Sequence, residues 1–235
     1  MKWFSGARRQ YPWRQTHNWF HLMMAELMLR RTRSDQVAQV YSRFTRNYRN
    51  AARASEDPDG VRSILQSLGL NWRNEQMLDT IQYVSHRFGN RHAPSAGDDL
   101  TEIPGVGDYC NSMLRSRLFG ESRAAIDSNV ARIYCRLVGE PYDPEVRRKK
   151  WLKDLSGRFM ELATAQSNPA ARKGPGPAPA SPEGLSHAME QATDPFEINL
   201  AFLDLAALLC RPSQPRCLEC PLRKHCEFAK SMQKS

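Results

Sequence analysis

Apolar residues recur at intervals of three and four positions through most of the chain, in residues 19–29, 61–70, 76–84, 109–119, 129–138 and 197–209. This spacing puts apolar side chains on one face of a helix. No run alternates apolar and polar residues over the length of a strand, and turn sequences rich in Pro, Gly and Asp separate the segments. The pattern therefore predicts an all-α protein with short connections.

Two stretches depart from this pattern. Residues 167–184 are rich in Pro, Ala and Gly, and such a composition buries too little apolar surface to offset its ordering entropy, so we expect a flexible loop. The apolar stretch 201–210 is short and contains Asp204, so we expect no membrane span. The first residues lack the apolar region of a signal peptide, and we expect a cytoplasmic, nucleoid-associated protein.

Charge adds a possible partner. The chain has 34 Lys and Arg against 25 Asp and Glu, for a net charge of +9. Residues 1–54 contain eleven basic residues but only Glu26 and Asp35 as acids. A surface this basic favours a polyanion such as nucleic acid. A solvated, solubilising surface would show the same excess, so charge alone leaves both interpretations open.

Four of the six cysteines fall within 17 residues and follow the spacing C-x6-C-x2-C-x5-C. They are Cys210, Cys217, Cys220 and Cys226. Without an export signal a disulfide framework is not expected, and the x2 pair gives the close approach that a metal centre needs. Four thiolates suit both Zn²⁺ and an iron–sulfur cluster, so ligand type leaves the metal open. Cys110 and Cys135 lie in helical patterns and are expected to be small buried side chains.

A second motif lies at Ile103-Pro104-Gly105-Val106-Gly107, directly before a helical segment. Two glycines around one apolar residue allow a tight backbone turn. The amides of that turn, with the following helix N-terminus, can bind a phosphate without reading base sequence. Many helix–helix turns look the same, so this motif alone does not decide between a structural turn and a phosphate site.

Two carboxylates are candidates for chemistry. Asp127 precedes a helical segment, where it can cap the helix or stabilise a cationic sugar near a pocket. Glu26 is the single acid of an apolar helical run. It can pair with Arg30 four residues later, or face a cavity where burial would raise its pKa and suit it to donate a proton.

The cysteine spacing, the G-V-G hairpin and Asp127-x-Asn129, which starts 20 residues after the second glycine, resemble the helix-hairpin-helix DNA glycosylases of the endonuclease III and adenine glycosylase branch. The resemblance covers residues 11–165 and 195–230. It implies a [4Fe–4S] cluster on the four cysteines, and DNA-phosphate contacts by Arg211 and Arg216 in the loop between the first two. Asp108, where the family usually has a basic or polar residue, is expected to weaken phosphate binding at the hairpin.

The same resemblance implies roles in base excision. Asp127 and Asn129 match the segment that holds the catalytic aspartate, with Asn129 expected to contact DNA. Glu26 matches the acid of the adenine and mismatch-thymine glycosylases. Tyr109 stands where lyase members carry the lysine that forms a Schiff base, which a phenol cannot do. Tyr109 could equally be an aromatic that packs within its helix.

The resemblance further implies two helical lobes with a cleft for double-stranded DNA between them. Residues 11–121 would form a six-helix barrel with the hairpin, and 1–10 with 122–235 the cluster lobe. The expected enzyme is a monomeric, monofunctional glycosylase acting on thymine or uracil opposite guanine, with Leu70 as a wedge and Arg30 or Arg31 facing the orphan guanine.

Three alternatives stay open at this point. An adenine glycosylase is favoured by Glu26, but Tyr109 and the short sequence after Cys226 argue against it. A bifunctional glycosylase/lyase lacks its lysine. A non-catalytic DNA-binding iron–sulfur protein would not need both Glu26 and Asp127.

Overall fold

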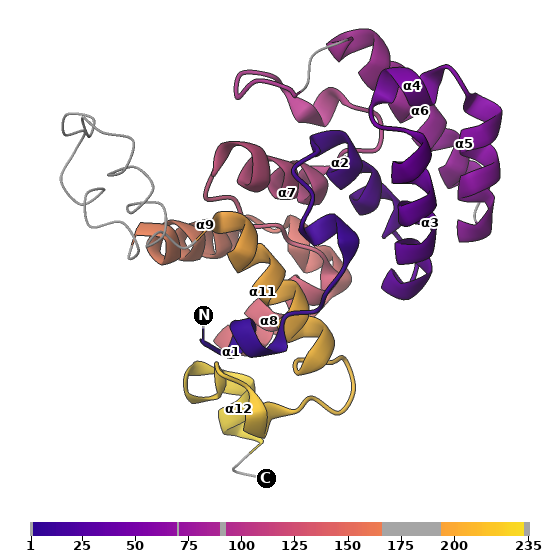
Figure 1. Cartoon of the computed structure of the whole chain (residues 1–235). Helices are drawn as coiled ribbons and strands as arrows, with labels where there is room; N and C mark the ends of the chain where they lie inside the picture. Colours follow the sequence, from indigo (N-terminus) through magenta and orange to yellow (C-terminus); the bar gives the residue numbers. More distant parts are fainter. Residues whose placement is uncertain (1, 70, 90–92, 166–193, 233–235) are drawn as a thin grey trace. The chain divides into compact units, whose positions relative to one another are not determined.

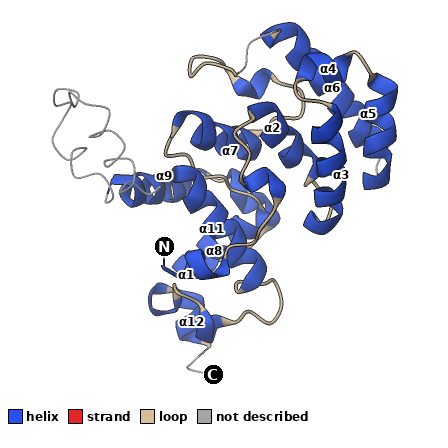
Figure 2. Ribbon diagram, viewed as in Figure 1, coloured by secondary structure: helices blue, strands red, loops and turns tan. Residues whose placement is uncertain are grey.

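The structure is a computed structural model that describes residues 2–69, 71–89, 93–165 and 194–232 (Figure 1). All regular elements in these ranges are helical, as Figure 2 shows, and the all-α prediction is confirmed. Within the same ranges, no helix combines the length and apolar character required to cross a bilayer. Residue 70 and the segment 167–184, for which the sequence predicts a wedge and a loop, lie outside the described residues.

The chain divides into two compact units. The first comprises Arg9–Leu114, and the second combines Met1–Arg8 with Arg115–Ser235. For brevity they are called the hairpin unit and the cysteine unit, after the motif that each contains.

The hairpin unit is built from helices that wrap an aromatic and aliphatic core. The α-helices are α2 (Trp19–Met28), α3 (Ser34–Asn47), α4 (Ala51–Ser55), α5 (Pro58–Leu65), α6 (Asn71–Phe88) and the first part of α7 (Asp108–Phe119). The 3₁₀ turns are η1 (Pro12–Arg14), η2 (Gln66–Leu68) and η3 (Leu100–Glu102). Helix α2 is almost entirely buried, and the Asn18 side chain caps its start by accepting from the His21 amide.

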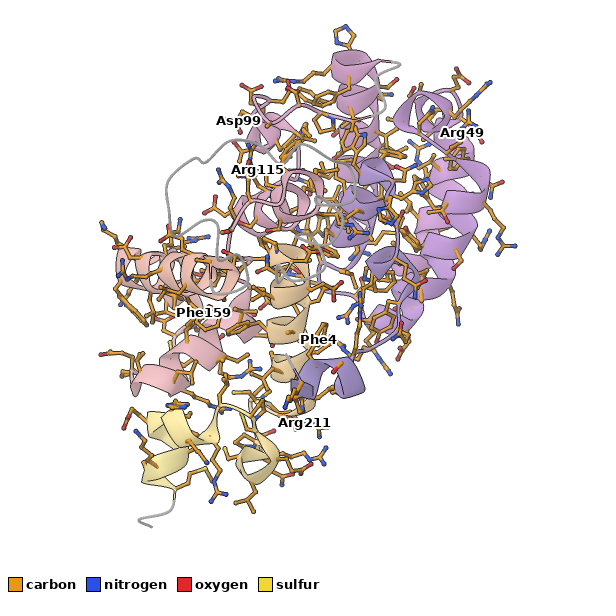
Figure 3. All side chains as sticks on the ribbon, turned by 60° about the vertical axis from the view of Figure 1, so that its left-hand side comes forward. Phe4, Arg49, Asp99, Arg115, Phe159 and Arg211 are labelled. Atoms are coloured by element: carbon orange, nitrogen blue, oxygen red, sulfur yellow. The ribbon has the colours of Figure 1, made fainter. Side chains whose placement is uncertain are left out.

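The cysteine unit has a separate core. Its helices are α1 (Lys2–Ala7), the rest of α7, α8 (Ser128–Val138), η4 (Pro144–Arg148), α9 (Lys150–Ala165), α11 (Pro195–Leu208), η6 (Cys217–Glu219), η7 (Arg223–His225) and α12 (Glu227–Ser231). The Tyr134 ring on α8 stacks on Phe202 of α11 with centroids 5.3 Å apart. Phe159 of α9, labelled in Figure 3, packs edge-on against both rings.

The apolar spacing located six of these helices, but it misplaced one end and did not single out several others, of which α3 and α9 are the longest. The segment 61–70 is not one helix, because α5 ends at Leu65 and Gly69 adopts φ +70°, a conformation that favours glycine. Helix α3 was not singled out, although its buried residues have the helical spacing. Helix α9 was missed because Ser156, a buried polar residue, interrupts its apolar face.

Candidate active site

The glycine hairpin is a tight turn anchored to α6. The Thr80 hydroxyl donates to the Pro104 carbonyl at 2.7 Å, and a Cβ on Gly105 would lie 3.3 Å from Leu27 Cδ2. Gly105 has φ +82°, so both space and backbone conformation favour glycine here. The Val106 side chain is buried and its amide donates to the Ile103 carbonyl at 2.9 Å. Gly107 is the exposed residue of the Gly-Val-Gly trio.

The residues that follow the hairpin start α7 and lie near the acid of α2. Glu26 is only 5% exposed. Burial raises the pKa of the Cys110 thiol, as does the nearby Glu26 carboxylate, whereas Arg30 acts in the opposite direction. The structure thus brings Glu26, Arg30 and Cys110 together inside the hairpin unit. Tyr109, next to Cys110, is half-buried, and Asp108 is exposed at the start of α7.

The turn that follows α2 presents two arginines to solvent. Arg30 and Arg31 are both exposed, and Arg31 adopts φ 59°, an unusual conformation for a residue other than glycine. The Arg30 side chain donates to Gln76 Oε1 at 3.3 Å. On its buried side, this turn is held by the Arg73 guanidinium, which donates to the Arg30 carbonyl and, at 2.7 Å, to Thr32 Oγ1.

Asp127 caps α8 in the cysteine unit, as its position in the sequence suggested. Its Oδ1 accepts from the Val130 amide at 2.7 Å. Its Oδ2 accepts from the Asn129 side-chain amide at 2.9 Å. The carboxylate is half-buried, so two donors fix its orientation while part of it faces outward.

Two arginines of α8 bond the cysteine motif, and one of them, Arg132, also bonds Asn129 beside this carboxylate. Arg132 Nη1 donates to Asn129 Oδ1 at 3.1 Å, and its Nε and Nη2 donate to the Cys210 carbonyl at 3.0 and 2.9 Å. Arg136 donates to Cys210 Sγ at 3.4 Å and to the Arg211 carbonyl at 2.7 Å. Sequence reasoning missed both, although two arginines four residues apart on an otherwise apolar helix are a usable signal for buried anchoring.

The four motif cysteines are half-buried neighbours. Burial raises the pKa of Cys217 and Cys220, and the other motif cysteines act on both in the same direction. Cys226 Sγ donates to the Arg136 carbonyl at 3.2 Å. In the part of the chain that the structure describes, no three His, Cys, Asp or Glu side chains are arranged to hold a metal ion. The chemistry of the donor set still suits a metal centre, because the four thiols interact electrostatically with one another and the Arg136 guanidinium donates to the Cys210 sulfur.

The loop between Cys210 and Cys217 carries the two arginines proposed for phosphate contacts. Both are exposed, and Figure 3 labels Arg211 just after α11. The Arg216 side chain forms an ion pair with Glu219 at 2.5 Å. Arg211 is therefore the more available cation for an external anion, since Arg216 would first have to leave its carboxylate.

The chain resembles known proteins over nearly its whole length. It is 29% identical over 225 residues to the thymine-DNA glycosylase of Aeropyrum pernix, covering 94% of this chain and 87% of that protein. It is 25% identical over 223 residues to the thymine/uracil-DNA glycosylase of Methanothermobacter thermautotrophicus, covering 94% and 87%. No family model matches the sequence.

Solved structures agree on the fold. A thermostable thymine-DNA glycosylase superposes with a TM-score of 0.77 at 23% identity, covering 98% of this chain and 93% of that one. A non-covalent endonuclease III–DNA complex gives 0.63 at 18% identity, covering 100% and 93%. In fold and in full-length sequence similarity, the chain resembles the helix-hairpin-helix superfamily of DNA glycosylases. Within that superfamily, the relatives just named are thymine- and uracil-DNA glycosylases.

Proposed function

We propose that the chain is a monofunctional DNA glycosylase that removes thymine or uracil opposite guanine from double-stranded DNA. The observation that carries this proposal is the fixed carboxylate of Asp127, held by one backbone and one side-chain donor. The target nucleotide must leave the base stack to reach such a group, because a stacked base hides its glycosidic bond.

Asp127 supplies the charge that the reaction needs. Breaking an N-glycosidic bond builds positive charge on the sugar, and a preorganised anion stabilises that charge without having to reorient. Two donors already hold the carboxylate, while its second oxygen keeps a lone pair for the sugar or for the attacking water. Asn129 positions Asp127 and does not itself react.

Glu26 is proposed as the proton donor to the departing base. It is buried beside the start of α7. A proton delivered to the leaving base reduces the negative charge that develops on it. Tyr109 offers a phenol in place of a lysine, so the product is expected to be an intact abasic strand.

DNA is held by backbone contacts on both units. We propose phosphate contacts at Gly105 and Gly107 in the hairpin, with Val106 contributing to the shape of the turn, and at Arg211 and Arg216. Such contacts fix position without reading sequence. Arg30 and Arg31 are proposed to face the orphan guanine, whose O6 and N7 accept from arginine, and Leu70 to fill the vacated stack.

Cys210, Cys217, Cys220 and Cys226 are proposed to hold a [4Fe–4S] cluster. A bound cluster would supply folding free energy to the loops that carry Arg211 and Arg216, because ligands far apart in an unfolded chain are joined to one centre. Arg136 donates to the Cys210 sulfur, and hydrogen bonds to the sulfurs tune such centres. Anaerobically purified protein should contain iron and absorb broadly in the visible range. A colourless protein with stoichiometric zinc would contradict the cluster.

The substrate is tested with a panel of duplexes containing T/G, U/G, A/G or A/8-oxoguanine pairs. Base release is scored with and without alkali. We expect thymine or uracil release, with strand breakage only after alkali. Release of adenine without any pyrimidine would overturn the substrate in favour of the adenine branch, and breakage without alkali would overturn the monofunctional assignment.

A further inference from the structure

A buried arginine joins two turns of the hairpin unit. One is the Leu29–Thr32 turn, which carries Arg30 and Arg31, and the other is the Leu68–Gly69 turn. Arg73, in the first turn of α6, is 1% exposed. Its Nη1 donates to the Arg30 carbonyl and to Thr32 Oγ1, and its Nη2 donates to the Leu68 carbonyl at 3.1 Å. The Gly69 carbonyl lies 3.5 Å from the same Nη2.

These two turns are distant in sequence and have unusual backbones. In the first, Arg31 has φ 59°, and in the second Gly69 has φ +70°. An L-residue in the left-handed region persists only where surrounding contacts hold it. One planar guanidinium can bond carbonyls on two sides at once, which gives the turns a shared, rigid anchor.

The buried guanidinium of Arg73 bonds no carboxylate among the described residues. Within the described ranges, its hydrogen-bond acceptors are three carbonyls and one hydroxyl, and its Nε–H has no partner. Burial lowers its pKa, as does the positive charge of Arg30. A buried cation that contacts only neutral oxygens and another cation loses solvation free energy that no carboxylate offsets. This cost favours a role beyond simple packing.

We propose that Arg73 is a positioning residue that holds the Leu29–Thr32 turn and the Leu68–Gly69 turn in a fixed arrangement for opening the duplex. This role of Arg73 is called the clamp below. The inference rests on the proposed function, since it assigns the turns to the DNA on either side of the flipped base. Arg30 and Arg31 can face the orphan base only if their turn keeps a fixed position relative to the Leu68–Gly69 turn, which is proposed to lie at the vacated stack. A lysine at position 73 would keep the charge but has no fork to reach both turns.

The first test measures the clamp without any DNA. Amide hydrogen exchange is compared in wild type, Arg73→Lys and Arg14→Lys. Arg14 is a matched control, because it is buried in the same unit and donates to the Arg9 carbonyl at 2.9 Å, away from both turns. We expect faster exchange at both turns in Arg73→Lys and at neither in Arg14→Lys. Unchanged exchange at either turn, or uniform acceleration of the whole unit, would overturn the proposal.

A milder variant guards against misfolding. Thr32→Val removes one acceptor from Arg73 and leaves its charge and burial in place. We expect faster exchange at Leu68–Gly69, on the far side of the guanidinium, and an effect confined to residues 29–33 would overturn the clamp.

The second test links the clamp to DNA opening. Single-turnover uracil release is measured from a U/G duplex and from the same strand without its complement. We expect Arg73→Lys to lower the rate of release from the duplex by about 10²-fold, which is the loss that a small misplacement of the reacting groups causes. Release from the single strand should fall far less. Equal losses on both substrates would contradict the positioning role. If wild type releases no base from either, the proposed function fails, and hydrogen exchange alone decides the clamp.

Discussion

Arg132 bonds the Cys210 carbonyl through two nitrogens, at 3.0 and 2.9 Å, and bonds Asn129 with the third at 3.1 Å. Asn129 in turn holds the carboxylate of Asp127. Within the cysteine unit, one buried guanidinium therefore links the first cysteine of the proposed cluster, through Asn129, to the proposed catalytic carboxylate of Asp127.

Replacing Arg132 should disturb both ends of this connection. Arg132→Lys keeps the charge but cannot serve two acceptors in different directions, so Asn129 and the Cys210 loop lose a common anchor. A buried acceptor left without its donor destabilises a protein by about 1–3 kcal/mol. We expect a lower melting temperature, a slower single-turnover base release and a lower iron content in the same variant.

The control for Arg132 is Arg148→Lys, at an exposed arginine of the same unit whose ion pair is with Glu145. Exposed pairs contribute little, so this variant should match wild type in all three measurements. Normal release by Arg132→Lys would show that Asp127 is oriented without it.

Tyr109→Lys should add lyase chemistry. The position follows the exposed Asp108 at the start of α7, and the half-buried Tyr109 lies next to Cys110 beside Glu26. An amine there could attack the abasic sugar and form a Schiff base, which borohydride reduces to a stable covalent adduct. We expect trapped enzyme–DNA complex with Tyr109→Lys, and none with wild type or Tyr109→Phe. Trapping of wild type would show that another lysine acts as nucleophile.

Arg211→Ala should reduce the salt dependence of DNA binding. Each phosphate neutralised contributes about 0.9 to the slope of log affinity against log salt concentration. Arg211 is exposed, and Arg136 bonds its backbone carbonyl rather than its side chain, whereas the Arg216 side chain is paired with Glu219. We expect the slope to fall by about one unit for Arg211→Ala and by less for Arg216→Ala. An unchanged slope in Arg211→Ala would remove that side chain from the interface.

Much of the fold and of the candidate site could be predicted from the sequence because the signals are local. The helix cap at Asp127 needs only an acid before an apolar helical run, and the structure confirms it. The hairpin glycine at 105 likewise follows from two glycines around one apolar residue, and its φ of +82° confirms the tight turn.

What the sequence did not reveal depends on contacts between distant segments. Arg73 acts on carbonyls of residues 30 and 68, and Arg132 on the carbonyl of residue 210. Backbone carbonyls have no sequence signature, so an apolar helix can mark an arginine such as Arg132 as buried but not the carbonyl that it will bind. Glu26 shows the same limit: the spacing allowed a pair with Arg30 or a buried acid, and only the structure gave its 5% exposure.

The most direct test of the central claim is single-turnover thymine release from a T/G duplex by wild type and Asp127→Asn. Asparagine can still cap α8 through its side-chain oxygen, so the fold and DNA binding should be preserved. Removing the negative charge near the sugar should slow release by about 10²–10³-fold. We expect release by wild type, this loss in the variant, and equal affinity of both proteins for the duplex. Equal rates for the two proteins would contradict the central claim.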